Sequence, residues 1–152
     1  MENIKITPKK ILIQTSVDAD FQTVVSNFNR NLFEALKPPL MPLKLLRYDG
    51  QETGDQVHLD LGFGQRWISL ISDHGQTESE WFFVDEGQVL PKPLRHWKHI
   101  HKIIKQTESK TLIIDDISFS SGSSLLDLLL YPFLYFQFAL RKPAYKKYFG
   151  KM

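Results

Sequence analysis

The chain has 152 residues, of which 42% are hydrophobic and 24% are charged, a composition that excludes an intrinsically disordered chain and suits one globular domain over 1–152. It has no cysteine, which excludes disulfides and thiolate metal sites and favours a reducing, cytoplasmic location. The net charge of +2 is too small to predict nucleic-acid binding, and the polar segment 1–10 lacks the apolar stretch of a signal peptide.

The N-terminal part of the chain predicts one strand followed by helices. Residues 10–18 alternate between an apolar and a more polar face, as in a half-buried strand. Asp18 or Asp20 then suits a helix N-cap. Apolar residues recur every three or four positions over 21–36, which predicts one or two short helices that end before the two prolines at 38–39.

The middle of the chain predicts a series of strands joined by short turns. The turn signals are Asp49-Gly50, the glycines at 62 and 64, and His74-Gly75. A longer loop with two prolines, residues 86–94, interrupts the series, and loops of this kind often border a ligand site. The predicted strands are 43–48, 56–63, 66–72, 78–85, 97–104 and 110–119.

The C-terminal part of the chain predicts a long buried helix over 125–140. This run is nearly all apolar, yet it is shorter than the roughly 20 residues of a membrane span and it contains Asp127. Pro132 should kink the helix because it removes one backbone hydrogen bond. The expected fold is therefore α+β: a curved antiparallel sheet of about six or seven strands wrapped around this helix, with one or two short helices after the first strand.

The charge of the chain is uneven at its C-terminal end. No acidic residue follows Asp127, whereas five basic residues do. The simplest interpretation is a solvated helix end whose cations favour the negative pole of the helix dipole. Contact with an anionic ligand or with a membrane surface is the less favoured alternative. The basic residues are Arg141, Lys142, Lys146, Lys147 and Lys151.

Several short motifs occur in an order that resembles the helix-grip superfamily often called SRPBCC, which includes START domains, birch-pollen-allergen-like proteins and polyketide cyclases. Bacterial ligand-binding SRPBCC proteins are the most similar, and the resemblance covers nearly the whole chain. It implies a deep, mostly apolar cavity between sheet and helix. It does not imply one activity, because the fold hosts carriers, cyclases, hydrolases and regulators. The motifs are Trp81-Phe82-Phe83-Val84-Asp85, a proline-containing loop, Trp97-x-His99-x-His101, Thr111 with Asp115, and Phe138-x-x-Arg141.

One residue departs from the pattern that the resemblance implies. Pro143 stands just after Arg141-Lys142, where the helix is expected to continue. The geometry of the basic tail therefore does not follow from the resemblance.

The candidate chemistry lies on the strand that contains Trp97, His99 and His101. Residues two apart in a strand share a face, so these side chains line up on one side, and Arg95 joins them if the strand starts early. Asp85 and Asp115 lie on the candidate neighbouring strands. A carboxylate that accepts from a histidine fixes its tautomer and raises its basicity, which is the general-base arrangement.

Three interpretations of this group remain open. The first, favoured on general grounds, is a structural network in which the two aspartates satisfy buried donors. The second is a ligand-orienting or catalytic set of His99, His101, Asp85 and Asp115. The third and least favoured is a metal site made by the two histidines and a carboxylate. We expect no metal and no cofactor.

Aromatic side chains are the candidates for lining the cavity. Asp127, Tyr131 and Tyr135 form a stripe at four-residue spacing on the last helix. The two tyrosine hydroxyls suit hydrogen bonds to a ligand, although core packing explains such a stripe more often. The ligand-binding candidates are Trp67, Phe83, Trp97, Tyr131, Tyr135 and Phe138; Phe82, Phe133 and Phe136 also suit an apolar wall.

These observations lead to three functional hypotheses. The first is a binding protein for a small hydrophobic or aromatic molecule. The second is a cyclase- or dehydratase-type enzyme that uses a His–Asp pair beside a substrate carbonyl. The third is an interaction protein whose helix simply fills the sheet. The expected partner is a small molecule rather than nucleic acid, and the sequence predicts no oligomeric state.

Overall fold

The computed structural model describes residues 7–38 and 42–150. The structure contains seven strands and four helices in these ranges. In chain order the elements are β1 (Lys9–Val17), α1 (Phe21–Ser26), α2 (Arg30–Leu36), β2 (Lys44–Tyr48), β3 (Gln56–Asp60), β4 (Arg66–Gln76), β5 (Glu80–Val89), β6 (His96–Lys105), β7 (Thr111–Ser120), α3 (Ser124–Ala139) and α4 (Arg141–Phe149).

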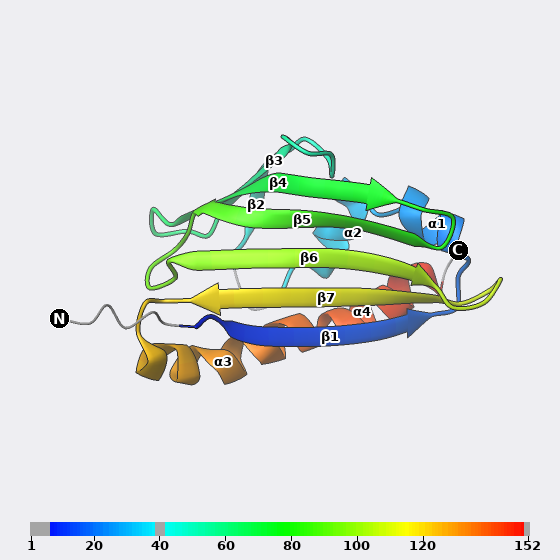
Figure 1. The fold of residues 1–152 in the computed structure, drawn as a ribbon. Coiled ribbons are helices and arrows are strands. Elements are labelled where there is room, and N and C mark those ends of the chain that lie inside the picture. Colours follow the sequence, from blue (N-terminus) through cyan, green and yellow to red (C-terminus); the bar gives the residue numbers. More distant parts are fainter. Residues whose placement is uncertain (1–6, 39–41, 151–152) are drawn as a thin grey trace.

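All seven strands form one antiparallel sheet in the order β1-β7-β6-β5-β4-β3-β2. Strands β2 to β7 form a meander, and its last strand, β7, pairs with the N-terminal strand β1. Strands β1 and β2 are therefore the two edges of the sheet. The helices lie behind the sheet and along its lower edge in Figure 1. The predicted helix-grip architecture, with its short helices after the first strand and its long bent C-terminal helix, is therefore confirmed.

The strand boundaries differ from the predicted ones at two glycine-containing signals. His74-Gly75 does not interrupt β4, because Gly75 pairs with Phe82 of β5 and a Cβ there would lie 2.6 Å from the Phe82 ring. The missing side chain thus makes room for an aromatic ring rather than a turn. In contrast, β3 stops at Asp60, and the Gly62-Phe63-Gly64 segment forms the turn that follows it, with all three residues at positive φ.

Both short helices begin at an N-cap of the expected type. Asp20 accepts from the backbone N–H of Thr23 at 2.9 Å, and Asn29 accepts from that of Leu32. The C-terminal helix is divided into α3 and α4 at Leu140, and Pro132 stands inside α3. Pro143 falls in the first turn of α4, where its missing N–H is not needed.

The apolar core is divided between two clusters on the helix-covered face of the sheet. One gathers the short helices and α4, and includes Tyr145 and Phe149, both fully buried. The other gathers α3 over β1, β6 and β7, and includes Trp97 and Phe119. Among the described residues, no helix combines the length and apolarity needed to cross a membrane.

Candidate functional site

The pairing of β5, β6 and β7 brings the predicted histidines and aspartates together. Asp85 lies directly opposite His99, and His101 lies directly opposite Asp115. All four side chains are on the helix-covered face, and His99 and Asp115 are only 3% and 1% exposed. Because alternate residues of β6 face this side, Trp97 belongs to the same row.

The hydrogen bonds run diagonally across the strands. His99 Nε2 lies 2.9 Å from Asp115 Oδ1, and His101 Nε2 lies 2.5 Å from Asp85 Oδ2. The directly opposite pairs are longer, at 3.8 Å between His99 Nδ1 and Asp85, and 3.9 Å between His101 Nδ1 and Asp115. The two imidazoles stack with their centroids 3.6 Å apart, so each carboxylate approaches both rings.

These contacts define which nitrogen of each histidine carries the proton. An ionised carboxylate only accepts hydrogen bonds, so Nε2 of both His99 and His101 must be the donor. Nδ1 is then the basic nitrogen in each ring. Nδ1 of His101 is buried without a partner among the described residues, and so is the second oxygen of Asp115. Each ring is thus paired at one nitrogen and basic at the other.

Helix α4 contributes a cation to this network. Arg141 Nη1 donates to Asp115 Oδ1 at 3.1 Å, and the hydroxyl of Tyr145, one turn further on, lies 3.5 Å from the same oxygen. The Arg141 side chain is only 14% exposed. The interpretation of the basic tail as a solvated helix end is therefore wrong for Arg141, because its position at the first turn of α4 points it into the protein.

The charges of this network follow from its burial and its contacts. Burial and the neighbouring His99 lower the pKa of His101 to about 4, despite its bond to Asp85. Burial raises the pKa of Asp115, but Arg141 and the His99 hydrogen bond more than offset it, and the pKa lies below its ordinary value. Burial also raises the pKa of Asp85, but the His101 hydrogen bond together with the nearby His99 and Arg141 more than offsets it, and this pKa too lies below its ordinary value. Both carboxylates are thus ionised and His101 is neutral at pH 7.

A cavity of about 450 Å³ lies beside this network. This volume is above the roughly 300 Å³ at which ligand pockets begin, which disfavours a helix that simply fills the sheet. Four members of the network line it: Asp85, His99, His101 and Arg141. Other polar residues also line it: Asn29, Lys37, Tyr48, Gln65, Ser69, Lys92 and Gln137. Most of the remaining wall is apolar, and includes Trp67, Phe83, Trp97, Leu134 and Phe138.

Several residues that line the cavity are exposed on the surface of the protein, and we call this part of its wall the cavity rim. Phe63, in the turn between β3 and β4, lines it and is fully exposed. Phe133 of α3 lines it and is 54% exposed. Pro91, Lys92 and Pro93, in the loop between β5 and β6, complete this rim. The predicted proline loop therefore does border the cavity, although β5 extends through half of it, to Val89.

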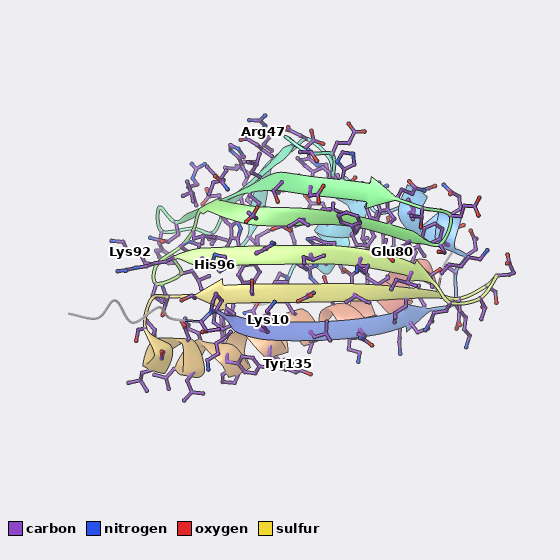
Figure 2. The ribbon with its side chains drawn as sticks, in the orientation of Figure 1. Lys10, Arg47, Glu80, Lys92, His96 and Tyr135 are labelled. Carbon is purple, nitrogen blue, oxygen red and sulfur yellow. The ribbon has the colours of Figure 1, made fainter. Side chains whose placement is uncertain are left out.

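Four of the six predicted ligand-binding aromatics line the cavity, and Tyr131 and Tyr135 do not. The residues of α3 and α4 that line it recur at spacings of three and four: Leu130, Phe133, Leu134, Gln137, Phe138 and Arg141. Tyr131 and Tyr135 are one position further along the helix, about 100° around it. They stack on each other at 6.0 Å, and Tyr135 is 43% exposed (Figure 2). Phe82 and Phe136, also suggested for the wall, lie outside it.

Asp85, His99 and His101 are close enough for a metal site, with one ligand atom of each within 4.8 Å of the others. The stacking of the rings argues against it. A histidine binds a metal through a lone pair in the plane of its ring, and two planes only 22° apart and 3.6 Å from each other do not converge on one ion. The arrangement favours hydrogen bonding over coordination.

Tyr145 and Ser69 were not singled out from the sequence, and Arg141 was named only in the Phe138-x-x-Arg141 motif and in the basic tail, not as a site residue. Arg141 and Tyr145 follow Phe138 at spacings of three and four, so the helical pattern that was followed to Leu140 continues to them. Ser69 of β4 accepts from the Trp67 indole at 3.0 Å and lies 3.4 Å from Asp85, which extends the polar network to a fourth strand. The only feature of the sequence that could have identified Ser69 is its position two residues after Trp67, on the same face of one strand.

Comparisons with known proteins agree on the fold. No protein-family model matches the sequence, and no curated protein does. Truncated norcoclaurine synthase from Thalictrum flavum has a similar structure, with a TM-score of 0.63 and 10% identity over 91% of this chain and 94% of that one. The same enzyme in complex with dopamine and hydroxybenzaldehyde gives 0.58 and 12% over 88% and 84%.

A bacterial protein of known structure is similar as well. The Zhui aromatase/cyclase from Streptomyces sp. R1128 superimposes with a TM-score of 0.60 and 13% identity, over 93% of this chain and 96% of that one. Identities this low establish the fold without an activity. The chain has the helix-grip fold that these structures share.

Proposed function

We propose that the protein binds a small, mostly apolar, aromatic molecule in the cavity between the sheet and α3. The observation that carries this proposal is a mostly apolar cavity wall that contains the hydrogen-bonded network of Asp85, His99, His101 and Arg141, which we call the polar end. Burial of apolar surface supplies affinity in such a pocket, and a few polar groups fix the orientation. The similar norcoclaurine synthase was solved with two small aromatic molecules, which supports the proposal by analogy.

The polar end favours a ligand that carries a hydroxyl or carbonyl group. Arg141 uses Nη1 for Asp115 and makes no other hydrogen bond within the described residues, so its remaining donors are available to a ligand oxygen. Asp85 is available to accept from a ligand hydroxyl. With His101 neutral, the two carboxylates outnumber the guanidinium, so a ligand carboxylate is disfavoured.

The binding proposal is tested with naphthol and naphthalene, a pair of probes that differ by one hydroxyl. We expect calorimetry to detect both, with naphthol at least about tenfold tighter because of its hydrogen bonds. Val57→Trp places a large ring in the cavity and should weaken naphthol binding by at least about tenfold. His58→Trp, on the opposite face of β3, is the matched control and should bind like the wild type.

Native mass spectrometry of the freshly purified protein complements this experiment, because a co-purified molecule would identify the ligand class directly. Failure of the wild type to bind either probe, together with a mass that shows no bound molecule, would overturn the proposal. Equal binding by Val57→Trp and His58→Trp would place the probe outside the cavity.

A second candidate function is an enzyme of the cyclase or dehydratase type. The observation that favours it is the pairing of His99 Nε2 with Asp115, which leaves Nδ1 of His99 as a basic nitrogen in a ring that lines the cavity. In this proposal His99 removes a proton from the carbon beside a ligand carbonyl, and Arg141 stabilises the enolate oxygen that forms. Asp115 keeps the imidazole in the required tautomer.

This candidate predicts that the protein exchanges the α-protons of tetralone, an aromatic ketone, with solvent deuterium. Proton transfer by a positioned side chain contributes about 10²–10⁴-fold, so we expect a rate at least about 100-fold above the buffer-catalysed rate. His99→Gln should abolish the acceleration while naphthol still binds. His96→Gln, at the start of β6, is the matched control. Exchange that is no faster than in buffer would contradict the enzyme candidate and leave binding as the only proposed function.

A further inference from the structure

Helix α3 presents a nearly uninterrupted apolar surface to the outside of the molecule. Only one of its sixteen residues is charged, Asp127, and that side chain is fully buried. The helix lies along the lower edge of the molecule, below β1, with no other element on its outer side in Figure 1. The exposed fractions of its large apolar side chains are 69% for Leu125, 60% for Leu128, 65% for Leu129, 54% for Phe133 and 60% for Phe136.

This surface, which we call the α3 face, is continuous with the rim of the cavity. Phe133 belongs to both, since it is exposed and also lines the cavity. Across the cavity stands Phe63, a fully exposed aromatic side chain at the tip of the β3–β4 turn, held at a φ of 53°. A bulky residue in the left-handed region is uncommon. An apolar patch of this kind on a soluble domain indicates an interaction surface.

Basic side chains stand on the cavity rim and next to both ends of α3. Lys92 stands on the cavity rim, and Arg95 packs against Gly122 just before α3 begins. Beyond the C-terminal end of α3, the lysines at 142, 146 and 147 are exposed on α4. None of these five side chains pairs with a carboxylate within the described parts of the chain.

We infer that the α3 face docks the protein on a lipid bilayer that carries anionic headgroups, with the cavity rim against the lipid. Leu128, Leu129, Phe133 and Phe136 enter the boundary between headgroups and acyl chains, as the apolar face of an interfacial helix does. The flanking lysines and arginine contact the phosphates. Figure 2 shows Lys10 and Lys92 toward the same end of the molecule as the N-terminal part of α3.

A second copy of the chain fits this surface less well. An antiparallel pair of α3 helices would place the lysines of one α4 beside the N-terminal end of the other α3. That end holds Arg95 and no exposed acidic side chain of α3. Like charges would meet in such a dimer, whereas an anionic membrane supplies the opposite charge.

Flotation of the full chain with vesicles tests the inference. We expect binding to vesicles of phosphatidylcholine and phosphatidylglycerol in a three-to-one ratio, and much weaker binding to phosphatidylcholine alone. The double variant Leu128→Ser, Leu129→Ser should bind the mixed vesicles at least about tenfold more weakly, because two exposed leucines no longer enter the lipid. High salt should weaken binding by the wild type.

The matched control is Leu12→Ser, Leu46→Ser, which removes two exposed leucines from β1 and β2 instead and should bind vesicles like the wild type. Naphthol affinity is measured on every variant. Leu128 and Leu129 do not line the cavity, so it should not change, and membrane docking stands or falls separately from the proposed ligand binding.

Three results would overturn the inference. The first is a wild-type protein that stays in the aqueous fraction with mixed vesicles. The second is equal flotation of the two double variants. The third is sedimentation of the wild type as a dimer that only the Leu128→Ser, Leu129→Ser variant dissociates, which would assign the α3 face to a second copy.

Discussion

Replacement of Asp115 by Asn is expected to reduce the free energy of unfolding by about 3–5 kcal/mol, because it breaks a buried ion pair from one side. Asp115 is 1% exposed and accepts hydrogen bonds from both His99 and Arg141. Without its charge, the Arg141 guanidinium remains buried with no neutralising partner within hydrogen-bond distance. Urea denaturation followed by circular dichroism measures the loss.

The neighbouring residue offers a matched control. Asp116 lies on the other face of β7, so Asp116→Asn should change the free energy of unfolding by no more than about 0.5 kcal/mol. The double variant Asp115→Asn, Arg141→Met removes both charges and should regain most of the lost stability. A loss below about 1 kcal/mol for Asp115→Asn would show that the ion pair does not stabilise the junction between α4 and the sheet.

Acidification from pH 7.5 to pH 5 is expected to destabilise the protein by about 2 kcal/mol through His101 alone. Its pKa is lowered from 6.5 to about 4 by burial and by His99. Between these two values the unfolded chain binds a proton that the folded protein does not, so stability falls as the pH falls. The lowered pKa values of Asp85 and Asp115 act in the same direction, but only below their ordinary value of 3.8.

Urea denaturation of the wild type and of His101→Gln at both pH values measures the contribution of His101 to this loss of stability. The variant lacks the titrating group and should lose about 2 kcal/mol less on acidification than the wild type does. His96→Gln, outside the network, should keep the wild-type dependence on pH. Parallel losses in the wild type and His101→Gln would show that His101 is protonated in the folded protein.

The sequence by itself predicted the fold because the fold depends on local patterns. Alternation at period two marked the strands, and the apolar run at 125–140 marked the helix. Strand boundaries were less predictable where a glycine served packing. Gly75 looked like a turn signal, yet its missing side chain accommodates the Phe82 ring on the neighbouring strand.

The candidate site was predicted only as far as one strand allows. Because residues two apart share a face, Trp97, His99 and His101 were placed together from the sequence. The sequence did not show which carboxylate would meet which imidazole. The register of three strands decided that, and it produced diagonal bonds with the rings stacked between the two aspartates.

For the C-terminal helix, the sequence determined the element itself, whereas only the tertiary structure decided which of its sides is buried. The sequence determined that it is long, apolar and contains a proline. It did not determine which side is buried, because nearly every position is apolar and periodicity therefore has no contrast. Only the packing of α3 and α4 on the sheet turned Phe138 and Arg141 into the cavity, placed Tyr131 and Tyr135 beside it, and left Leu128, Leu129 and Phe136 on the surface.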